Sequence, residues 1–565
     1  MAPTTTENNE KGKTILLTRH GRVKRVRDVV SKLFFDDDDD PVLSTRSKTW
    51  LRRRASSSSS SSNGSNNNRR EEILENDDDG VHVALNSRAN VLAFRRKSVV
   101  LVCSICRVGD AEDDDEDGAK HGVITVNNNN NNNNNRKDIR ARSMAFVDFA
   151  PDDASFLLVG LSNGRLEGYD CADVESPRLL FSRKVSRAPL VSIRSRPSGQ
   201  RLGPKEKDES DEDGKEEEEE EEEEEVTIFA ENGDVLRVDS LEMKSHLYRL
   251  RMARKQFAHD FHPEKDDYNT LTGMVKFDGF KRIAPIRDGV CVGNVPIKCS
   301  EAGLRERKNN NTCLNALLNA SDDDDDDDDD EKDENKFGFV ACGKFGTIAF
   351  VQASGGSKFG AVESVSMAAK KIFSFFAKKT KDIQKKRFDI VGDDDEEDDD
   401  DKNEESENNA ALKPSKWKSA IVDGPRKMTN ILISPDGVVL AATDLLGRVT
   451  TYDCKYGQLT TVSMIKGCRD SDVGFVDERE LVVFSPHRGG GVLEYFPSRQ
   501  AYTKPVQIGK ELVVGRDSRI LSSQRALGTL FNTNTIKVAG QKDFDDAGSY
   551  FLGPDGNIDR ISISC

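Results

Sequence analysis

One pattern recurs seven times along this sequence: an apolar run, a short polar turn that usually contains glycine, and a run in which apolar and polar residues alternate. Such alternation is typical of a strand with one buried face, and a turn glycine suits the positive φ of a tight hairpin. The pattern therefore predicts seven β-hairpins. They span residues 90–103, 156–170, 226–239, 337–351, 438–453, 481–496 and 549–563, and the turn glycines are Gly164, Gly233, Gly346, Gly447, Gly491 and Gly556.

The spacing of these hairpins favours a ring of repeated blades. Seven units in about 350 globular residues give about 50 residues per unit, close to the ~40–50 of propeller blades. Two hairpins are preceded by a further strand and turn, in DFAPDDASFLLVG and ILISPDGVVLAAT, as in a WD-type blade. We predict an all-β fold, a seven-bladed WD-like β-propeller. A generic antiparallel sandwich is the alternative, because it also has evenly spaced hairpins.

Homopolymeric runs separate several of the hairpins. Such runs bury no apolar surface, so nothing offsets the entropy lost when they become ordered. They are poly-Asn at 127–135, poly-Glu at 216–225, poly-Asp at 322–330 and an acidic run at 393–401. We predict a disordered basic and Ser-rich arm at 1–78 and a propeller at 79–565, with disordered insertions at about 107–140, 198–225, 300–335 and 380–416.

The acidic runs also conceal the charge of the remaining chain. The formal net charge is −17, from 84 Lys+Arg and 101 Asp+Glu. Without these acidic runs and the five aspartates at 36–40 it becomes roughly +16, so the part that folds is expected to be basic.

Two stretches have the periodicity of a helix, which predicts one or two peripheral helices. The first is Leu241–Phe257, and the second is Val362–Lys379. In the second, Ile372, Phe373 and Phe376 lie on one side and lysines elsewhere. This pattern fits either a helix packed on the propeller rim or a basic amphipathic helix for a membrane surface or a partner groove.

Several classes of protein and of site do not fit the sequence. No segment approaches the ~18 apolar residues of a membrane-spanning helix, and the N-terminus has no apolar signal core. We therefore expect a cytoplasmic protein with free thiols. Cys103-x-x-Cys106 has no second pair at metal-ligand spacing, so we expect no metal and no cofactor. Basic stretches without interleaved aromatic residues do not predict nucleic-acid binding.

A short tripeptide suggests an enzyme as a remote alternative. Arg19-His20-Gly21 matches the R-H-G element of histidine phosphatases. Their chemistry needs a His nucleophile in an Arg-lined anion pocket on a parallel α/β sheet, and no α/β pattern follows this segment. We therefore expect no catalytic residues and no enzyme.

The segment 430–496 contains a Gly-Arg-Val turn, a Tyr-Asp strand end and a Lys-Gly-x-Arg-Asp block at 466–470, in this order. With these elements it resembles the N-terminal domain of the non-catalytic (regulatory) subunit of the Rab-three GTPase-activating protein complex. The strand and helix at 226–258 fit the same family in order. Candidate partner-binding residues are Gly447, Arg448, Asp453, Lys466, Gly467, Arg469, Asp470 and Arg488. A purely structural turn between blades is the alternative explanation of the 466–470 block.

The resemblance implies a regulatory subunit that pairs with a separate catalytic subunit, which carries the family's arginine finger. It implies action on Rab-type small GTPases, as GTPase activation or nucleotide exchange, in membrane trafficking and autophagy. The implied location is the cytoplasm, with peripheral contact to the endoplasmic reticulum or other membranes. The family continues with a long helical region, whereas this sequence ends at Cys565, so we expect a propeller-only relative or an incomplete gene model. A generic WD-type scaffold in another multiprotein complex is the alternative function.

Overall fold

The computed structural model describes the regular elements of the chain and the shorter connections between them. It describes residues 14–23, 30, 81–107, 120–126, 139–149, 155–196, 224–257, 262–263, 274–294, 336–343, 346–354, 416–422, 427–435, 437–454, 459–476, 480–496, 512–513, 518–522, 548–553 and 555–564.

Seven antiparallel sheets contain the described strands, and we number them as blades in chain order. Blade 1 has β2 (His82–Leu85), β3 (Val91–Arg96), β4 (Val99–Ser104) and β6 (His121–Thr125). Blade 2 has β7 (Ala141–Asp148), β8 (Ser155–Leu161), β9 (Arg165–Asp170) and β10 (Arg178–Lys184). Blade 3 has β11 (Leu190–Arg196), β12 (Glu225–Ala230), β13 (Val235–Asp239) and β14 (Val275–Phe277). Blade 4 has β15 (Ile286–Asn294), β16 (Lys336–Gly343), β17 (Thr347–Ser354) and β18 (Lys416–Val422).

The remaining blades come from the C-terminal part of the chain and from its N-terminal strand. Blade 5 has β19 (Met428–Ile433), β20 (Val439–Asp444), β21 (Arg448–Asp453) and β22 (Thr460–Lys466). Blade 6 has β23 (Asp472–Val476), β24 (Glu480–Ser485), β25 (Val492–Phe496) and β26 (Leu512–Val513). Blade 7 has β27 (Arg519–Ser522), β28 (Ser549–Leu552), β29 (Asn557–Ser564), β1 (Thr14–Arg22) and the short β5 (Cys106–Arg107).

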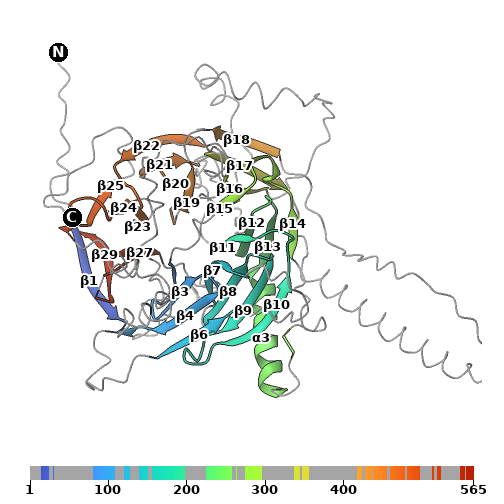
Figure 1. Cartoon of the computed structure of the whole chain (residues 1–565). Coiled ribbons are helices and arrows are strands. Elements are labelled where there is room, and N and C mark those ends of the chain that lie inside the picture. The colour runs from blue at the N-terminus through green and yellow to red at the C-terminus, as the bar shows by residue number, and fades with distance from the viewer. Residues whose placement is uncertain are drawn as a thin grey trace, which may run out of the picture.

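The blades close into a ring (Figure 1). The first strand of each blade contacts the first strand of the next, from β2 through β7, β11, β15, β19 and β23 to β27, and β27 contacts β2. The predicted seven-bladed β-propeller is therefore confirmed.

The seven predicted hairpins are the second and third strands of the seven blades. All six turn glycines have positive φ, between 72° and 102°. The turn of blade 1 has no glycine, and there Lys97 takes the left-handed conformation with φ 52°. The glycine turn thus marks the same position in each of the other blades, which is why it could be recognised as a repeat.

Two strands lie where the sequence predicted disordered segments. β1 falls within the arm predicted at 1–78, and β6 falls within the insertion predicted at 107–140. The partner of β1 is β29 at the other end of the chain, so nothing near β1 in sequence indicates the pairing. β6 is a single strand between an acidic and an Asn-rich run, and composition hides its alternating burial.

The first predicted helix is confirmed as α3 (Ser240–Gln256). The side chain of Asp239 caps its N-terminus by accepting from the backbone N–H of Leu241 at 2.8 Å. Met243, Leu247 and Leu250 enter one hydrophobic cluster with strands of blades 2 and 3. A short 3₁₀-helix, η2 (Lys281–Ile283), lies between β14 and β15. The second predicted helix, with Ile372, Phe373 and Phe376, lies outside the described residues.

Within the described parts of the chain, no helix has the length and apolar character needed to cross a membrane.

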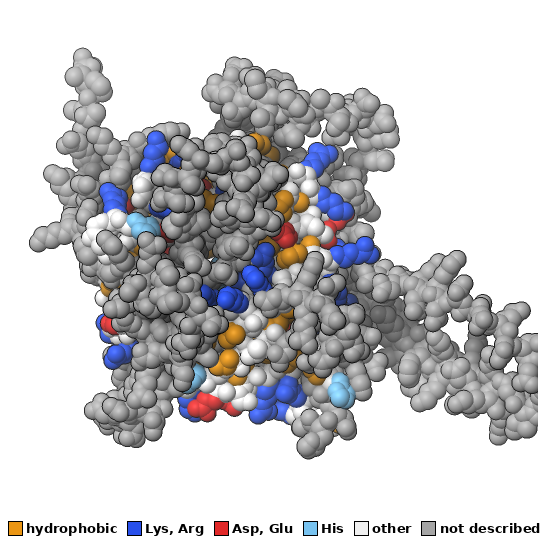
Figure 2. All heavy atoms as spheres, in the orientation of Figure 1, with side chains coloured by type: hydrophobic (Ala, Val, Ile, Leu, Met, Phe, Trp, Pro, Cys, Tyr) orange, Lys and Arg blue, Asp and Glu red, His pale blue; other side chains and the backbone are white. Residues whose placement is uncertain are grey.

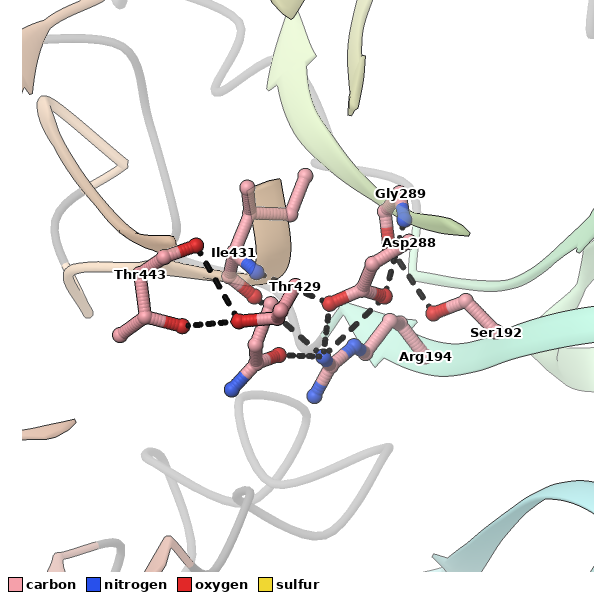
Figure 3. Close-up of polar contacts among 8 residues, drawn as sticks. Ser192, Arg194, Asp288, Gly289, Thr429, Ile431 and Thr443 are labelled. Atoms are coloured by element: carbon pink, nitrogen blue, oxygen red, sulfur yellow. Dashed lines mark hydrogen bonds and ion pairs between the residues drawn. The ribbon is translucent and has the colours of Figure 1, made fainter. Parts of the chain in front are cut away.

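Buried polar groups connect neighbouring blades near the centre of the ring (Figure 3). Ser192 of blade 3 donates from Oγ to the carbonyl oxygen of Gly289 in blade 4 at 3.1 Å. Asp288 accepts the backbone N–H of Ile431 in blade 5 at 2.9 Å and pairs with Arg194 of blade 3 at 3.0 Å. One carboxylate thus joins three successive blades, and this fixes their relative positions.

Candidate functional site

Most of the sequence-predicted partner-binding residues meet at one end of blades 5 and 6. Arg448 is opposite Lys466 in the β21–β22 pair, and Asp472 is opposite Phe484 in the β23–β24 pair. Because neighbouring strands run antiparallel, the β20–β21 turn, the β22–β23 connection and the β24–β25 turn share one end of their sheets. We call residues 444–448, 466–471 and 485–491 the blade 5–6 loop cluster.

Asp444 organises the β20–β21 turn. Its Oδ1 accepts the backbone N–H of Arg448 at 3.0 Å, and its carbonyl oxygen accepts the N–H of Gly447 at 3.2 Å. The guanidinium of Arg448 lies 3.7 Å from Oδ2 of the same carboxylate. Asp444 is buried and Arg448 half-buried, so the pair forms the base of the cluster rather than its contact surface.

Gly447 brings the turn against the β22–β23 connection. Its φ is 77°, and its carbonyl oxygen accepts the backbone N–H of Cys468 at 2.8 Å. A Cβ at this position would lie 2.9 Å from the backbone nitrogen of Arg469, so a side chain cannot be added without displacing that backbone. Gly467 also has positive φ, 82°, but a Cβ there would meet nothing within 4 Å.

The 466–471 connection is held to the β24–β25 turn of blade 6. Asp470 has φ 54° and bonds Nε2 of His487 through Oδ2 at 2.8 Å. Arg488 donates from Nη1 to Oε1 of Glu494 at 2.6 Å. These contacts keep the three segments of the cluster at fixed positions, and they support a structural role for Asp470 and Arg488.

The outer surface of the cluster combines apolar and cationic side chains. Leu445 is 36% exposed and Leu446 53% exposed. Lys466 and Arg469 are exposed as well. A small apolar tip bordered by cations is suited to an apolar protein surface with an acidic border.

One predicted partner-binding residue lies outside this cluster, and the cluster contains residues that the sequence analysis did not name. Asp453 ends β21, opposite Val439 and Thr460, and so lies at the far end of the strand from Gly447. Leu445 and Leu446 were not selected, although two leucines in a turn are a usable signal because turn residues are normally polar. His487 gave no signal, because its role depends on Asp470 of the preceding blade.

The cysteines and the histidine that could suggest a metal site or an enzyme are packed into the fold. No group of three or more potential metal ligands occurs among the described residues. Burial raises the pKa of Cys103 to about 12 and that of Cys468 to about 11. His20 lies on β1, contacts the ring of Tyr550 edge-on and bonds the carbonyl oxygen of Ala89 at 3.0 Å. The R-H-G tripeptide thus has a structural explanation in the closure of the ring.

Comparisons with known proteins give one family match. A family model described as "Rab3 GTPase-activating protein regulatory subunit N-terminus" matches residues 79–483. No match was found among curated protein sequences. Among solved structures, the crystal structure of Saccharomyces cerevisiae Sqt1 is 10% identical, covering 86% of this chain and 84% of that chain with a TM-score of 0.36.

Proposed function

Because the chain belongs to the family of the Rab3 GTPase-activating protein regulatory subunit N-terminus, we propose that it serves as the non-catalytic regulatory subunit of a Rab GTPase regulator. In this role it binds a separate catalytic subunit and a Rab-type small GTPase. It promotes GTP hydrolysis or nucleotide exchange on that GTPase. The observation that carries the proposal is the family match over residues 79–483, which spans blades 1 to 5 and reaches β24 of blade 6.

The propeller supports a scaffold mechanism. A rigid ring with loops at its ends offers a broad surface to other proteins, and holding two of them together raises their effective concentration. The blade 5–6 loop cluster is our proposed contact surface. Leu445 and Leu446 would supply the apolar centre, and Lys466 and Arg469 would face acidic groups of the partner.

We further propose that the protein works in the cytoplasm at the surface of membranes such as the endoplasmic reticulum, in membrane trafficking and autophagy. Imaging of the fluorescently tagged full chain tests this location. A uniform distribution with no enrichment at membranes would contradict it.

Reconstitution tests the proposed function. The full chain is mixed with the catalytic subunit and candidate Rab proteins from the same organism, and single-turnover GTP hydrolysis and GDP release are measured. We expect the chain to co-purify with the catalytic subunit and to increase one of the two rates. No effect on any Rab, together with co-purification of partners unrelated to Rabs, would favour a generic scaffold instead.

Two matched pairs of variants test the contact surface. Leu446→Asp and Arg469→Glu are expected to reduce partner binding at least about tenfold, as substitution of central interface residues does. The controls are Val123→Asp on β6 and Arg22→Glu on β1, which change exposed side chains of other blades in the same way. Equal losses for variants and controls would exclude the cluster as the contact surface while leaving the regulatory role open.

A further inference from the structure

The helix α3 presents a surface apart from the blade 5–6 loop cluster. It lies at the rim beside β10 and β13, in a different sector of the ring from β21–β25 (Figure 1). Its inner side, with Met243, Leu247 and Leu250, is fully buried between blades 2 and 3. Its outer side therefore faces away from the propeller on a rigid support.

The outer side carries residues at the spacing of a coiled-coil seam. Leu241, Ser245, Tyr248, Met252 and Lys255 follow one another at alternating intervals of four and three residues, which places them on one face. Leu241 is 61% exposed and Met252 62% exposed. Tyr248 is half-buried and is held by edge contacts with Phe149 and Phe156. The seam is narrow, with three apolar residues in five positions.

Cations border this seam on both sides. With Leu241 and Met252 in the seam, Lys244 and Arg251 take the flanking position on one side, and Glu242, Arg249 and Gln256 take it on the other. Arg251 also pairs with Asp170 of β9 at 3.0 Å. The acidic group on the helix itself is Glu242 in the first turn.

The neighbouring strand β10 adds to this positive charge. Burial, with Arg249 and Arg183 beside it, lowers the pKa of His246 to about 4, so this ring adds no charge at neutral pH. Arg178 lies close enough to Arg254 to lower its pKa, after the larger effect of burial. Figure 2 shows Lys and Arg side chains gathered in the region of β10 and α3 at the edge of the molecule.

We propose that α3 is a docking site for an acidic amphipathic helix of a partner protein. That helix has apolar residues at its seam positions and Asp or Glu beside them, so that its side chains pack on Leu241 and Met252 while its carboxylates face Lys244 and Arg249. A narrow seam bordered by charge is the pattern of helix pairing. A lipid surface requires a wide apolar face, which α3 has already buried against the propeller. The proposal does not depend on any action on Rab proteins.

A designed helix serves as the probe. It is a labelled peptide of three heptads with Leu at the seam and Glu at the flanking positions, and its binding to the full chain is measured by fluorescence anisotropy. One comparison peptide has Lys at the flanking positions, and another has Ser at the seam. We expect the Glu peptide to bind at least tenfold more tightly than both. Equal binding of the Glu and Lys peptides would overturn the proposal.

Variants of α3 make the test specific. Met252→Asp should weaken binding of the Glu peptide at least tenfold, whereas Val123→Asp, at a side chain 44% exposed on β6, should leave it unchanged. The double variant Lys244→Glu with Arg249→Glu should reverse the preference and favour the Lys peptide. Equal loss in the Val123→Asp control, or no reversal in the double variant, would contradict docking on α3. Circular dichroism checks that each variant is folded.

Vesicles test the competing occupant. The full chain is floated with vesicles of phosphatidylcholine and with vesicles that also contain phosphatidylserine. We expect no flotation that depends on Met252. If phosphatidylserine vesicles bind the chain, Met252→Asp abolishes that binding, and the Glu peptide does not compete, then α3 is a lipid-binding surface and the helix proposal is wrong. A photo-crosslinker placed at Met252 in cells should join to a peptide with an acidic heptad pattern.

Discussion

At the scale of single residues, positive φ and close approach are separate reasons for a glycine. Gly447 and Gly467 lie in the same loop cluster and have nearly the same φ, 77° and 82°. A Cβ on Gly447 would press on the backbone of Arg469, whereas a Cβ on Gly467 would enter open space. The two positions therefore separate conformational strain from steric conflict.

We expect Gly447→Ala to destabilise the protein by clearly more than Gly467→Ala. The left-handed conformation costs alanine about 1–2 kcal/mol at either position. At Gly447 the displaced backbone and the hydrogen bond from Cys468 add to this cost. Urea denaturation of both variants measures the difference. Equal losses of stability would mean that the contact with Arg469 has no energetic consequence.

A second residue-scale feature is a buried carboxylate at the end of a homopolymeric run. Glu225 is the last residue of the poly-Glu run and the first of β12, and it is fully buried. Arg237 donates to it, and Arg196 lies 3.5 Å from it. Burial by itself raises the pKa of Glu225, but Arg237 and Arg196 outweigh burial and the net pKa is lowered. The guanidinium of Arg237 also lies 3.7 Å from the ring centroid of Phe337.

Glu225→Gln is expected to destabilise the protein by about 3–5 kcal/mol, because it leaves two buried guanidinium groups without their counter-charge. The control is Glu175→Gln at an exposed position between β9 and β10, with an expected change of less than about 0.5 kcal/mol. Thermal and urea unfolding measure both. A small effect at Glu225 would mean that the two arginines find other partners in the variant.

At the scale of secondary-structure elements, α3 contains a titratable group whose charge opposes folding. His246 is buried on α3 and contacts the ring of Phe181 edge-on. Its Nδ1 accepts a hydrogen bond from Nη2 of Arg249 at 3.2 Å. Burial, Arg249 and Arg183 lower its pKa from 6.5 to about 4. The folded protein therefore holds this imidazole neutral over a pH range in which the unfolded chain protonates it.

This difference predicts a loss of stability on acidification. The contribution of His246 is fully present above pH 6.5 and is lost as the pH falls toward 4, because the unfolded state then binds the additional proton. The loss amounts to at most about 3 kcal/mol. Urea midpoints between pH 4.5 and 7.5 should vary less in His246→Leu than in the wild type. His121→Gln, at an exposed residue of β6, is the control, and an equally flattened profile there would contradict the assignment.

Local signals explain which elements could be predicted from the sequence. A hairpin contains both strands and its turn within about 15 residues, so Gly164 and Gly233 with their flanking strands were sufficient to identify two blades. α3 could also be predicted from the sequence, because its capping Asp239 and its apolar residues lie in one continuous stretch. β1 and the short β5 could not be predicted, since each pairs with a distant part of the chain, and β6 was hidden by the biased runs on either side of it.

The candidate site follows the same rule: its local motifs could be predicted from the sequence, and its contacts between blades could not. The family resemblance identified Gly447 and the 466–470 block, and the structure places them in contact. The bond between Asp470 and His487 joins two blades, so no local pattern could indicate it. Asp453 belongs to the Tyr-Asp strand end of the family resemblance, and it lies at the opposite end of β21 from Gly447.

At the scale of the whole molecule, the ring closes through the two distant parts of the chain in blade 7. β1 pairs with β29 from Thr14 opposite Ser564 to Arg22 opposite Asn557. Arg19 pairs with Asp559, and Ile15 and Leu17 pack on the cluster of blades 6 and 7. Within β1, a Cβ on Gly21 would lie 2.7 Å from Ile105 and 2.8 Å from the carbonyl oxygen of Cys106. β1 thus covers β29, which would otherwise expose an unpaired edge.

Removal of residues 1–23 should therefore open the ring, whereas removal of residues 1–13, which lie outside the described part of the chain, should leave closure intact. The longer deletion exposes the edge of β29, so we expect a melting temperature lower by at least about 5 °C and concentration-dependent self-association. Differential scanning calorimetry and analytical ultracentrifugation measure these effects.

A synthetic peptide of residues 12–24 should restore part of the lost stability, because it can pair with β29 in the native register. The same peptide with Gly21→Val should restore less, since the added side chain meets Ile105. Equal melting temperatures for the two deletions would mean that the ring holds together without β1, and that the contacts between β27 and β2 suffice to close it.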